Sequence, residues 1–210
     1  MHRALWALLA GALLAFVALA LGYDHEPLVS IDSEVVAWTA ADMPAWLEWL
    51  ARPFSWVGGW IGLTALGIVA GVVLLRERAW LDFGLFLAAV LGTQVVVSLL
   101  KAFFDRARPD LETVVTLPGS PAFPSGHAAA GAASFGALAI LLAERLPRGV
   151  RTEFWLGVAL LGTAIGLSRI ALGVHFVTDV VAGWSIGLAW LAACLLVRDR
   201  LRRSAPQPLV

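Results

Sequence analysis

The sequence predicts an all-α, polytopic membrane protein with six transmembrane helices and one or two short interfacial helices after the first. Hydrophobic residues make up 60% of its 210 residues and charged residues 14%, against about 45–50% and about 25% in soluble domains. A membrane-spanning helix needs about 20 mostly apolar residues, because lipid offers the backbone no hydrogen-bonding partners. Six stretches qualify, at residues 4–23, 54–75, 79–103, 125–143, 154–173 and 175–197. We treat residues 1–210 as one domain.

The first stretch has two interpretations. The residues "MHR", the apolar run and "ALA" at 18–20 fit a cleaved signal peptide as well as a retained helix. The apolar run is long for a signal sequence, so we expect a retained transmembrane helix.

The segment at residues 24–53 follows this helix and carries Trp38, Trp46 and Trp49 among acidic residues. Indole rings prefer the membrane–water interface. The pattern predicts one or two short amphipathic helices at that interface. A loop anchored by the same tryptophans fits equally well.

Basic residues predict the orientation of the chain, because Lys and Arg are enriched in cytoplasmic loops. Ten of the fifteen basic residues fall at the chain ends or after the second and fourth spans: Arg3, Arg76, Arg78, Arg145, Arg148, Arg151, Arg198, Arg200, Arg202 and Arg203. The segment 24–53 on the other face has Arg52 as its one basic residue. We expect a protein of the plasma (inner) membrane with both termini in the cytoplasm.

Composition also excludes some functions. The net charge is zero and the longest basic run is the short "RDRLRR", so we expect no nucleic-acid partner. The single cysteine, Cys194, excludes an intrachain disulfide, and its apolar surroundings indicate packing. No feature of the sequence indicates an oligomeric state.

Several ionisable residues depart from the positive-inside trend. Lys101, Arg106, Arg108 and Arg169 lie at or near the predicted outer ends of the third and fifth spans. Charge at membrane depth is costly and indicates a functional site.

The predicted topology brings these cations together with two histidines. Lys101 and His127 flank one outer connection, and His127 and His175 are 48 residues apart, which is enough for two crossings and a return to the same face. We therefore expect Lys101, Arg108, His127, Arg169 and His175 to share one outer pocket.

His175 and Asp179 are four residues apart at a predicted helix start, so their side chains share one helical face. A carboxylate so placed can hold the imidazole in one tautomer and keep its other nitrogen nucleophilic. The cations add an anion site, since guanidinium groups bind phosphate oxygens in bidentate fashion. The sequence "PSGH" at a helix start adds backbone N–H groups. Together these residues predict a phosphoryl pocket in which one histidine attacks phosphorus and the other protonates the leaving oxygen.

Three ordered motifs carry a resemblance to a known family. They are "KAFFDRARP" from Lys101, "PSGH" at residues 124–127 and "SRIALGVHFVTD" from Ser168 to Asp179. On them the chain resembles the type 2 phosphatidic acid phosphatases, the membrane branch of the lipid phosphate phosphatase superfamily. The resemblance implies an integral membrane hydrolase that needs no metal or other cofactor.

The resemblance also implies roles for individual residues. His175 would be the nucleophile that forms a phosphohistidine, Asp179 its orienting partner and His127 the general acid. The phosphate would be held by Lys101, Arg108, Arg169 and the backbone at Ser125 and Gly126. Asp105 and Arg106 lie between motif positions and receive no role; we expect them to form a surface ion pair.

The substrate and some alternatives stay open. Undecaprenyl diphosphate, phosphatidylglycerol phosphate and phosphatidic acid are family substrates among which the sequence does not choose. Phosphate transfer to a second lipid would use the same site, and a non-enzymatic transporter or binding protein for anionic lipids would use the same cations. Zinc binding by His127, His175 and Asp179 is a further alternative, which the surrounding cations disfavour.

Overall fold

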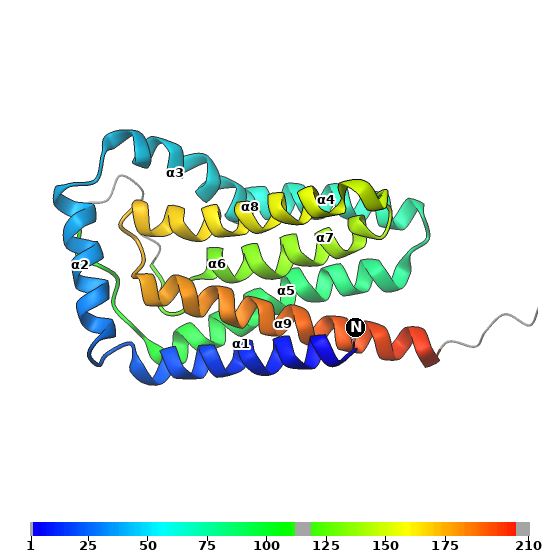
Figure 1. Ribbon diagram of the computed structural model, residues 1–210, viewed down its shortest axis with the longest axis horizontal. Coiled ribbons are helices and arrows are strands. Elements are labelled where there is room, and N and C mark those ends of the chain that lie inside the picture. Colours follow the sequence, from blue (N-terminus) through cyan, green and yellow to red (C-terminus); the bar gives the residue numbers. More distant parts are fainter. Residues whose placement is uncertain (1, 112–118, 205–210) are drawn as a thin grey trace, which may run out of the picture.

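The computed structural model describes residues 2–111 and 119–204, and all regular structure in those ranges is helical (Figure 1). The elements in chain order are α1 (His2–Gly22), α2 (Leu28–Ala41), α3 (Ala45–Gly58), α4 (Trp60–Arg76), α5 (Trp80–Phe104), α6 (Gly126–Ala130), a π-helical turn (Gly131–Phe135), α7 (Gly136–Ala143), a 3₁₀ turn (Arg148–Val150), α8 (Arg151–Ala171) and α9 (Val177–Ser204).

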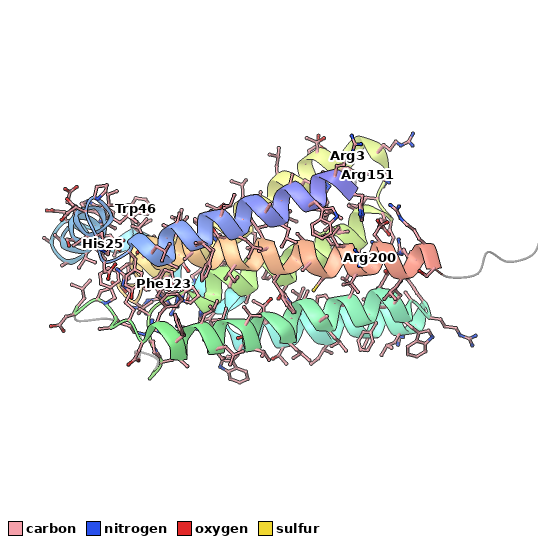
Figure 2. The ribbon with its side chains drawn as sticks, turned by 90° about the horizontal axis from the view of Figure 1, so that it is seen from below. Arg3, His25, Trp46, Phe123, Arg151 and Arg200 are labelled. Carbon is pink, nitrogen blue, oxygen red and sulfur yellow. The ribbon has the colours of Figure 1, made fainter. Side chains whose placement is uncertain are left out.

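The long helices run side by side, and α2 lies across one end of the bundle (Figure 1). We call this the α2 end, and the opposite end, where α1 begins and α9 finishes, the terminal end. Figure 2 places Arg3, Arg151 and Arg200 at the terminal end and His25, Trp46 and Phe123 at the α2 end. These three of the ten basic residues expected on one face therefore lie at one end of the bundle.

Within the described ranges, five helices are long and apolar enough to cross a membrane, and the bent pair α3–α4 makes a sixth candidate. These candidates follow the six stretches predicted from the sequence, with ends that differ by a few residues. The longest departures are at the start of the second candidate, which begins at Ala45 and not at 54, and at the end of α9, which continues to Ser204, past the predicted end at 197.

The second predicted span, 54–75, was expected to be one helix, and that expectation is wrong. The chain forms α3, which begins at Ala45, and then α4, with a bend of 46° between them. Gly59 lies at the break with an extended backbone. Glycine weakens a helix interior, so the adjacent Gly58 and Gly59 make this the easiest place to break it. For residues 24–53, the sequence allowed either short helices or a loop. The structure has helices there, α2 and the first part of α3.

Close packing of α9 on α6 sets the geometry at the α2 end. A Cβ atom added to Gly183 would lie 2.5 Å from the carbonyl oxygen of Ser125, and one on Gly187 would collide with the carbonyl of Ala129. Glycines spaced four apart allow two membrane helices to approach this closely. The start of α6 is thereby held against the first turns of α9. Farther along α9, Cys194 is buried in the core, as expected.

Candidate active site

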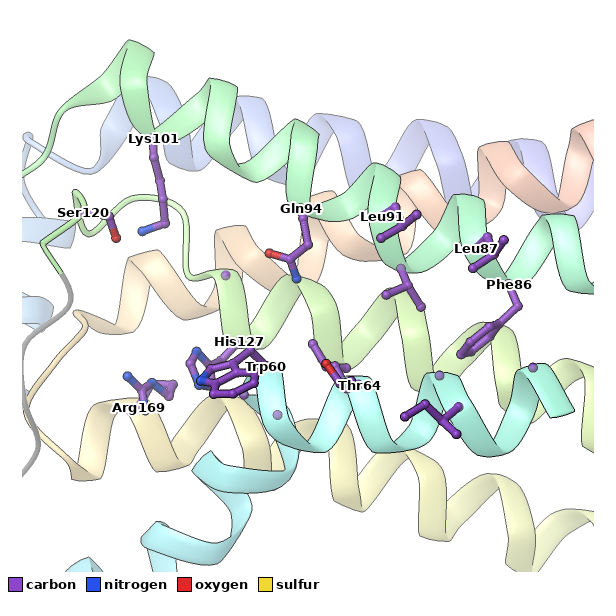
Figure 3. Close-up of a pocket in the computed structure, with 18 of the residues that line it drawn as sticks. Trp60, Thr64, Phe86, Leu87, Leu91, Gln94, Lys101, Ser120, His127 and Arg169 are labelled. Atoms are coloured by element: carbon purple, nitrogen blue, oxygen red, sulfur yellow. The ribbon is translucent and has the colours of Figure 1, made fainter.

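Six of the eight predicted site residues line the polar end of one cavity, and this end lies at the α2 end of the bundle; Ser125 and Asp179 are not among its lining residues. Its volume is about 760 Å³, and its polar end is lined by Lys101, Arg108, Ser120, Gly126, His127, Arg169 and His175 (Figure 3). These residues come from α5, α6, α8 and the connections that follow α5 and α8. The structure therefore brings together the two histidines and three cations that the topology predicted to meet.

His175 is held on both sides of its ring. Its Nδ1 lies 3.2 Å from Asp179 Oδ2, and its Nε2 lies 3.2 Å from a terminal nitrogen of Arg108. A guanidinium group can only donate hydrogen bonds, so Nε2 is the accepting, unprotonated nitrogen and Nδ1 carries the proton. Burial lowers the pKa of His175 to about 4, so the ring is neutral at pH 7. The lone pair of Nε2 therefore faces Arg108.

Arg108 and Lys101 are held by neutral acceptors. Arg108 donates to the carbonyl oxygens of Ser120 at 2.9 Å and Val174 at 2.7 Å, and Lys101 donates to the carbonyl of Pro121. These contacts fix the two side chains without neutralising their charge. Each cation therefore remains available to an anion in the cavity.

Arg169 is the most buried of the three cations, with 5% of its surface exposed. One terminal nitrogen donates to the hydroxyl of Ser55 on α3, and its Nε has no hydrogen-bond partner among the described residues. A buried, unsatisfied charged donor is costly and marks a place for an anionic ligand. Arg169 forms no ion pair with Asp179, since that carboxylate pairs with Arg106 at 2.6 Å.

The sequence "PSGH" begins a helix as predicted, but one of its donors is already used. The backbone N–H of Ser125 donates to the carbonyl of Asp179 at 2.9 Å. The Ser125 hydroxyl is buried and has no hydrogen-bond partner among the described residues, and a phosphate-binding role for Ser125 stays a prediction. Gly126 and His127 follow at the start of α6, and both line the cavity. His127 Nε2 lies close to Gly59, where an added Cβ would be 3.4 Å from it.

The surface ion pair expected for Asp105 and Arg106 is wrong. Asp105 ends α5 in the left-handed conformation, with φ 44° and its N–H bonded to the carbonyl of Lys101, a common way to close a helix. This turn sends Arg106 inward, where it forms ion pairs with Asp32 at 2.9 Å and Asp179 at 2.6 Å. Hydrophobic periodicity could not reveal this, since Arg106 lies outside any helix and Asp32 lies 74 residues away.

The cavity continues from its polar end into a groove between α4 and α5 (Figure 3). Most side chains along it are apolar, among them Leu63, Ile68, Phe86 and Leu91. Thr64 on α4 and Gln94 on α5 are polar and also line it. An amphiphile fits this shape, with an anionic group among the cations and an apolar chain in the groove.

Residues 82–203 match the PAP2 superfamily. The chain belongs to that superfamily. Phosphatidylglycerophosphatase B of Bacillus subtilis is 30% identical over 178 residues, which cover 83% of this chain and 87% of the relative. Decaprenylphosphoryl-5-phosphoribose phosphatase of Mycobacterium tuberculosis is 33% identical over 167 residues, 76% of this chain and 82% of the relative.

Solved PAP2 structures share the fold. A transmembrane PAP2 type phosphatidylglycerolphosphate phosphatase from Bacillus subtilis superposes with a TM-score of 0.85 at 26% identity, covering 94% of this chain and 98% of that chain. LpxE of Aquifex aeolicus gives a TM-score of 0.60 at 26% identity over 78% of this chain and 94% of that chain. This PAP2 chain is thus a multi-pass membrane protein and a lipid phosphate phosphatase, as the three motifs predicted.

Proposed function

We propose that this PAP2 protein hydrolyses a phosphate ester on a membrane lipid through a phosphohistidine at His175, without a metal ion. The observation that supports it most is the continuity of the cavity. The accepting Nε2 of His175 lies beside Arg108 at one end, and the same cavity runs on as an apolar groove. A phosphate at the polar end would leave a lipid chain in the groove.

In the first step, Nε2 of His175 attacks phosphorus and the bond from phosphorus to the lipid oxygen breaks. Asp179 accepts the Nδ1 proton in a hydrogen bond throughout and stabilises the charge that develops on the ring. His127 gives its proton to the departing lipid alkoxide. Lys101, Arg108 and Arg169 stabilise the negative charge on the phosphoryl oxygens.

In the second step, a water molecule attacks the phosphohistidine. Its proton passes to His127, the nitrogen–phosphorus bond breaks, and inorganic phosphate leaves with both imidazoles restored. A lipid hydroxyl in place of water would give phosphate transfer with the same residues, and the ratio of free phosphate to phosphorylated acceptor distinguishes the two reactions.

We infer that the substrate is a glycerolipid phosphate of the phosphatidylglycerol phosphate type. Gln94 lies seven residues before Lys101, about 10 Å along the helix from it, and faces the groove (Figure 3). A polar side chain in hydrocarbon is costly without a partner. The ester and hydroxyl groups of a glycerolipid offer such a partner at this depth, whereas a polyprenyl chain offers none. The name of the Bacillus subtilis relative agrees.

The site is proposed to face the periplasm or exterior. Three of the ten basic residues that predict the cytoplasmic face, Arg3, Arg151 and Arg200, lie at the terminal end, and the cavity's polar end lies at the α2 end. Cysteines introduced singly at exposed positions, such as Trp49 in α3 and Arg200 in α9, test this with a membrane-impermeant thiol reagent on intact cells. Labelling of the cysteine at position 49 but not of the one at position 200 supports an outward-facing site. Labelling at position 200 but not at position 49 contradicts it.

Phosphate release from a panel of purified lipids tests the activity. The panel contains phosphatidylglycerol phosphate, phosphatidic acid and undecaprenyl diphosphate in the same detergent micelles. We expect the highest kcat/KM on phosphatidylglycerol phosphate and no release by His175→Ala. Equal release by His175→Ala contradicts the proposal.

Inhibitors test the absence of a metal. No three His, Cys, Asp or Glu side chains within the described ranges gather as a metal-binding group, and three cations repel a divalent ion. Vanadate, which mimics pentacoordinate phosphorus, is expected to inhibit, and chelators are expected to leave the rate unchanged. Inhibition by a chelator that added zinc reverses would support the zinc alternative.

A further inference from the structure

Arg106 and Asp32 lie directly behind the His175–Asp179 pair, and the reaction above does not use them. One terminal nitrogen of Arg106 donates to Asp179 Oδ1 at 2.6 Å, and the other donates to Asp32 Oδ2 at 2.9 Å. Oδ2 of Asp179 accepts from His175 and from the backbone N–H of Phe176. Both oxygens of the orienting carboxylate are therefore fixed, one by Arg106 and the other on the His175 side.

The guanidinium group of Arg106 is itself fixed between two rings. Its central carbon lies 4.6 Å from the ring centre of Tyr23 and 4.2 Å from that of Phe176. Its side chain is 12% exposed. A guanidinium stacked between aromatic faces has little freedom to turn, so its two nitrogens keep pointing at the two carboxylates.

Asp32 joins this arrangement to α2 and to the start of α9. It is 2% exposed, and its Oδ1 accepts the backbone N–H of Thr178 at 3.0 Å, while Oδ2 accepts the Thr178 hydroxyl. A carboxylate that accepts an unpaired N–H in the first turn of a helix stabilises that turn. Asp32 therefore fixes the turn of α9 from which Asp179 projects.

Charge gives the arrangement a second effect. Arg106 lies between two buried carboxylates, those of Asp32 and Asp179, and donates a hydrogen bond to each. Without Arg106, two negative charges would repel each other in a poorly solvated place, and the Asp179 carboxylate would lose the donor that fixes its Oδ1. A rotated Asp179 would no longer hold the Nδ1 proton of His175.

We propose that Arg106 and Asp32 are positioning residues that hold Asp179, and through it the His175 ring, in the orientation required for attack on phosphorus. The inference rests on the proposed role of His175. It assigns the α2 helix a part in catalysis, because Asp32 reaches the reacting pair from that helix.

Steady-state kinetics of Arg106→Gln, Arg106→Lys and Asp32→Asn test the inference on phosphatidylglycerol phosphate in micelles. We expect Arg106→Gln to lower kcat by about 10–100-fold, the range seen when a partner that orients an active group is lost. KM and vanadate inhibition should stay within about twofold, since the three phosphate-facing cations are unchanged. Arg106→Lys should recover part of the loss, because one donor and the charge remain.

A soluble aryl phosphate separates positioning from proton donation. Its leaving group needs no proton, so the loss caused by His127→Ala should largely disappear on it, whereas the loss caused by Arg106→Gln should persist. Arg52→Gln is the matched control, because Arg52 forms an exposed pair with Glu48 on α3. It should leave kcat unchanged.

Three results would overturn the inference: an unchanged kcat in Arg106→Gln, a rise in KM that accounts for the whole loss, or no recovery by Arg106→Lys. If Arg106→Gln does not fold, Asp32→Asn tests the inference in its place. We expect Asp32→Asn to lower kcat and leave KM unchanged, and an unchanged kcat would contradict the inference. Failure of the wild-type chain to release phosphate from any substrate would instead refute the proposed function.

Discussion

The two ends of the bundle both bury arginines, but they treat the charge differently. At the terminal end, Arg198 donates to Asp82 at 2.8 Å and to Glu144 at 2.9 Å, and Arg202 donates to Asp82 at 3.0 Å. The hydrogen bond from Arg198 lowers the pKa of Glu144, so this carboxylate stays ionised. Every contact in this cluster pairs a cation with an anion.

At the α2 end, Lys101, Arg108 and Arg169 donate to carbonyl and hydroxyl oxygens instead. Arg106, next to them, is the exception that is neutralised by carboxylates. Neutral acceptors fix a cation in place and leave its charge available to a ligand, whereas a carboxylate partner neutralises that charge. The partner of a buried arginine, rather than its burial, therefore separates a binding site from a structural ion pair.

Loss of the proton donor at the α2 end gives the largest effect expected among these tests. His127→Ala should lower kcat on a lipid phosphate by about 10²–10⁴-fold, since a positioned general acid contributes about that much. Steady-state kinetics of phosphate release measure it. A near-normal rate would remove the proton-donor role from His127.

Removing one cation from each end tests the comparison itself. Arg169→Gln should raise KM for the lipid phosphate by about 10–100-fold, because a hydrogen bond to a charged group is worth about 1.5–3 kcal/mol. Arg202→Gln at the terminal end should leave kcat and KM unchanged and lower only thermal stability. Equal kinetic effects of the two variants would show that partner type does not distinguish the clusters.

The pH dependence of kcat/KM sharpens the account of the α2 end. The lowered pKa of His175, about 4, means that Nε2 takes up a proton only as the pH falls through about 4, and the lone pair is lost below it. Activity of the free enzyme should fall about tenfold per pH unit below that point. The second ionisation of the phosphate, near pH 6, is measured separately by titration of the micelles. A histidine-dependent loss centred at pH 6.5 would contradict the assignment.

The smallest effect concerns the groove. Gln94→Leu should lower kcat/KM on phosphatidylglycerol phosphate by about 3–10-fold, the value of one lost hydrogen bond, and leave undecaprenyl diphosphate unaffected. Parallel assays of the two lipids give the ratio. Equal loss on both would show that Gln94 does not contact the glycerol region.

The fold and the meeting of the candidate site residues in one cavity could be predicted from the sequence because their signals are local. Apolar runs predict the membrane spans, and the number of crossings decides which helix ends lie on the same face. His175 and Asp179 are only four residues apart in the sequence. The bend at Gly59 could not be predicted, because the sequence is equally apolar on both sides of the break. Glycine marks where breaks are tolerated and does not require them.

The supporting residues could not be predicted, because they depend on tertiary contacts. Ser55 reaches Arg169 across 114 residues, and Asp32 reaches Thr178 across 146. A serine or an aspartate in an amphipathic segment has many ordinary explanations. Only the packing of α2 and α3 over the ends of α8 and α9 shows what these side chains contact.

Trapping of a phosphoryl enzyme tests the central claim most directly. The wild-type chain, mixed with lipid labelled in its phosphate and quenched in alkali within milliseconds, should carry label on a peptide containing His175. That label should be stable to alkali and released by acid, and His175→Ala should carry none. Label that survives acid, or a full amount of label in His175→Ala, would contradict a nucleophilic His175.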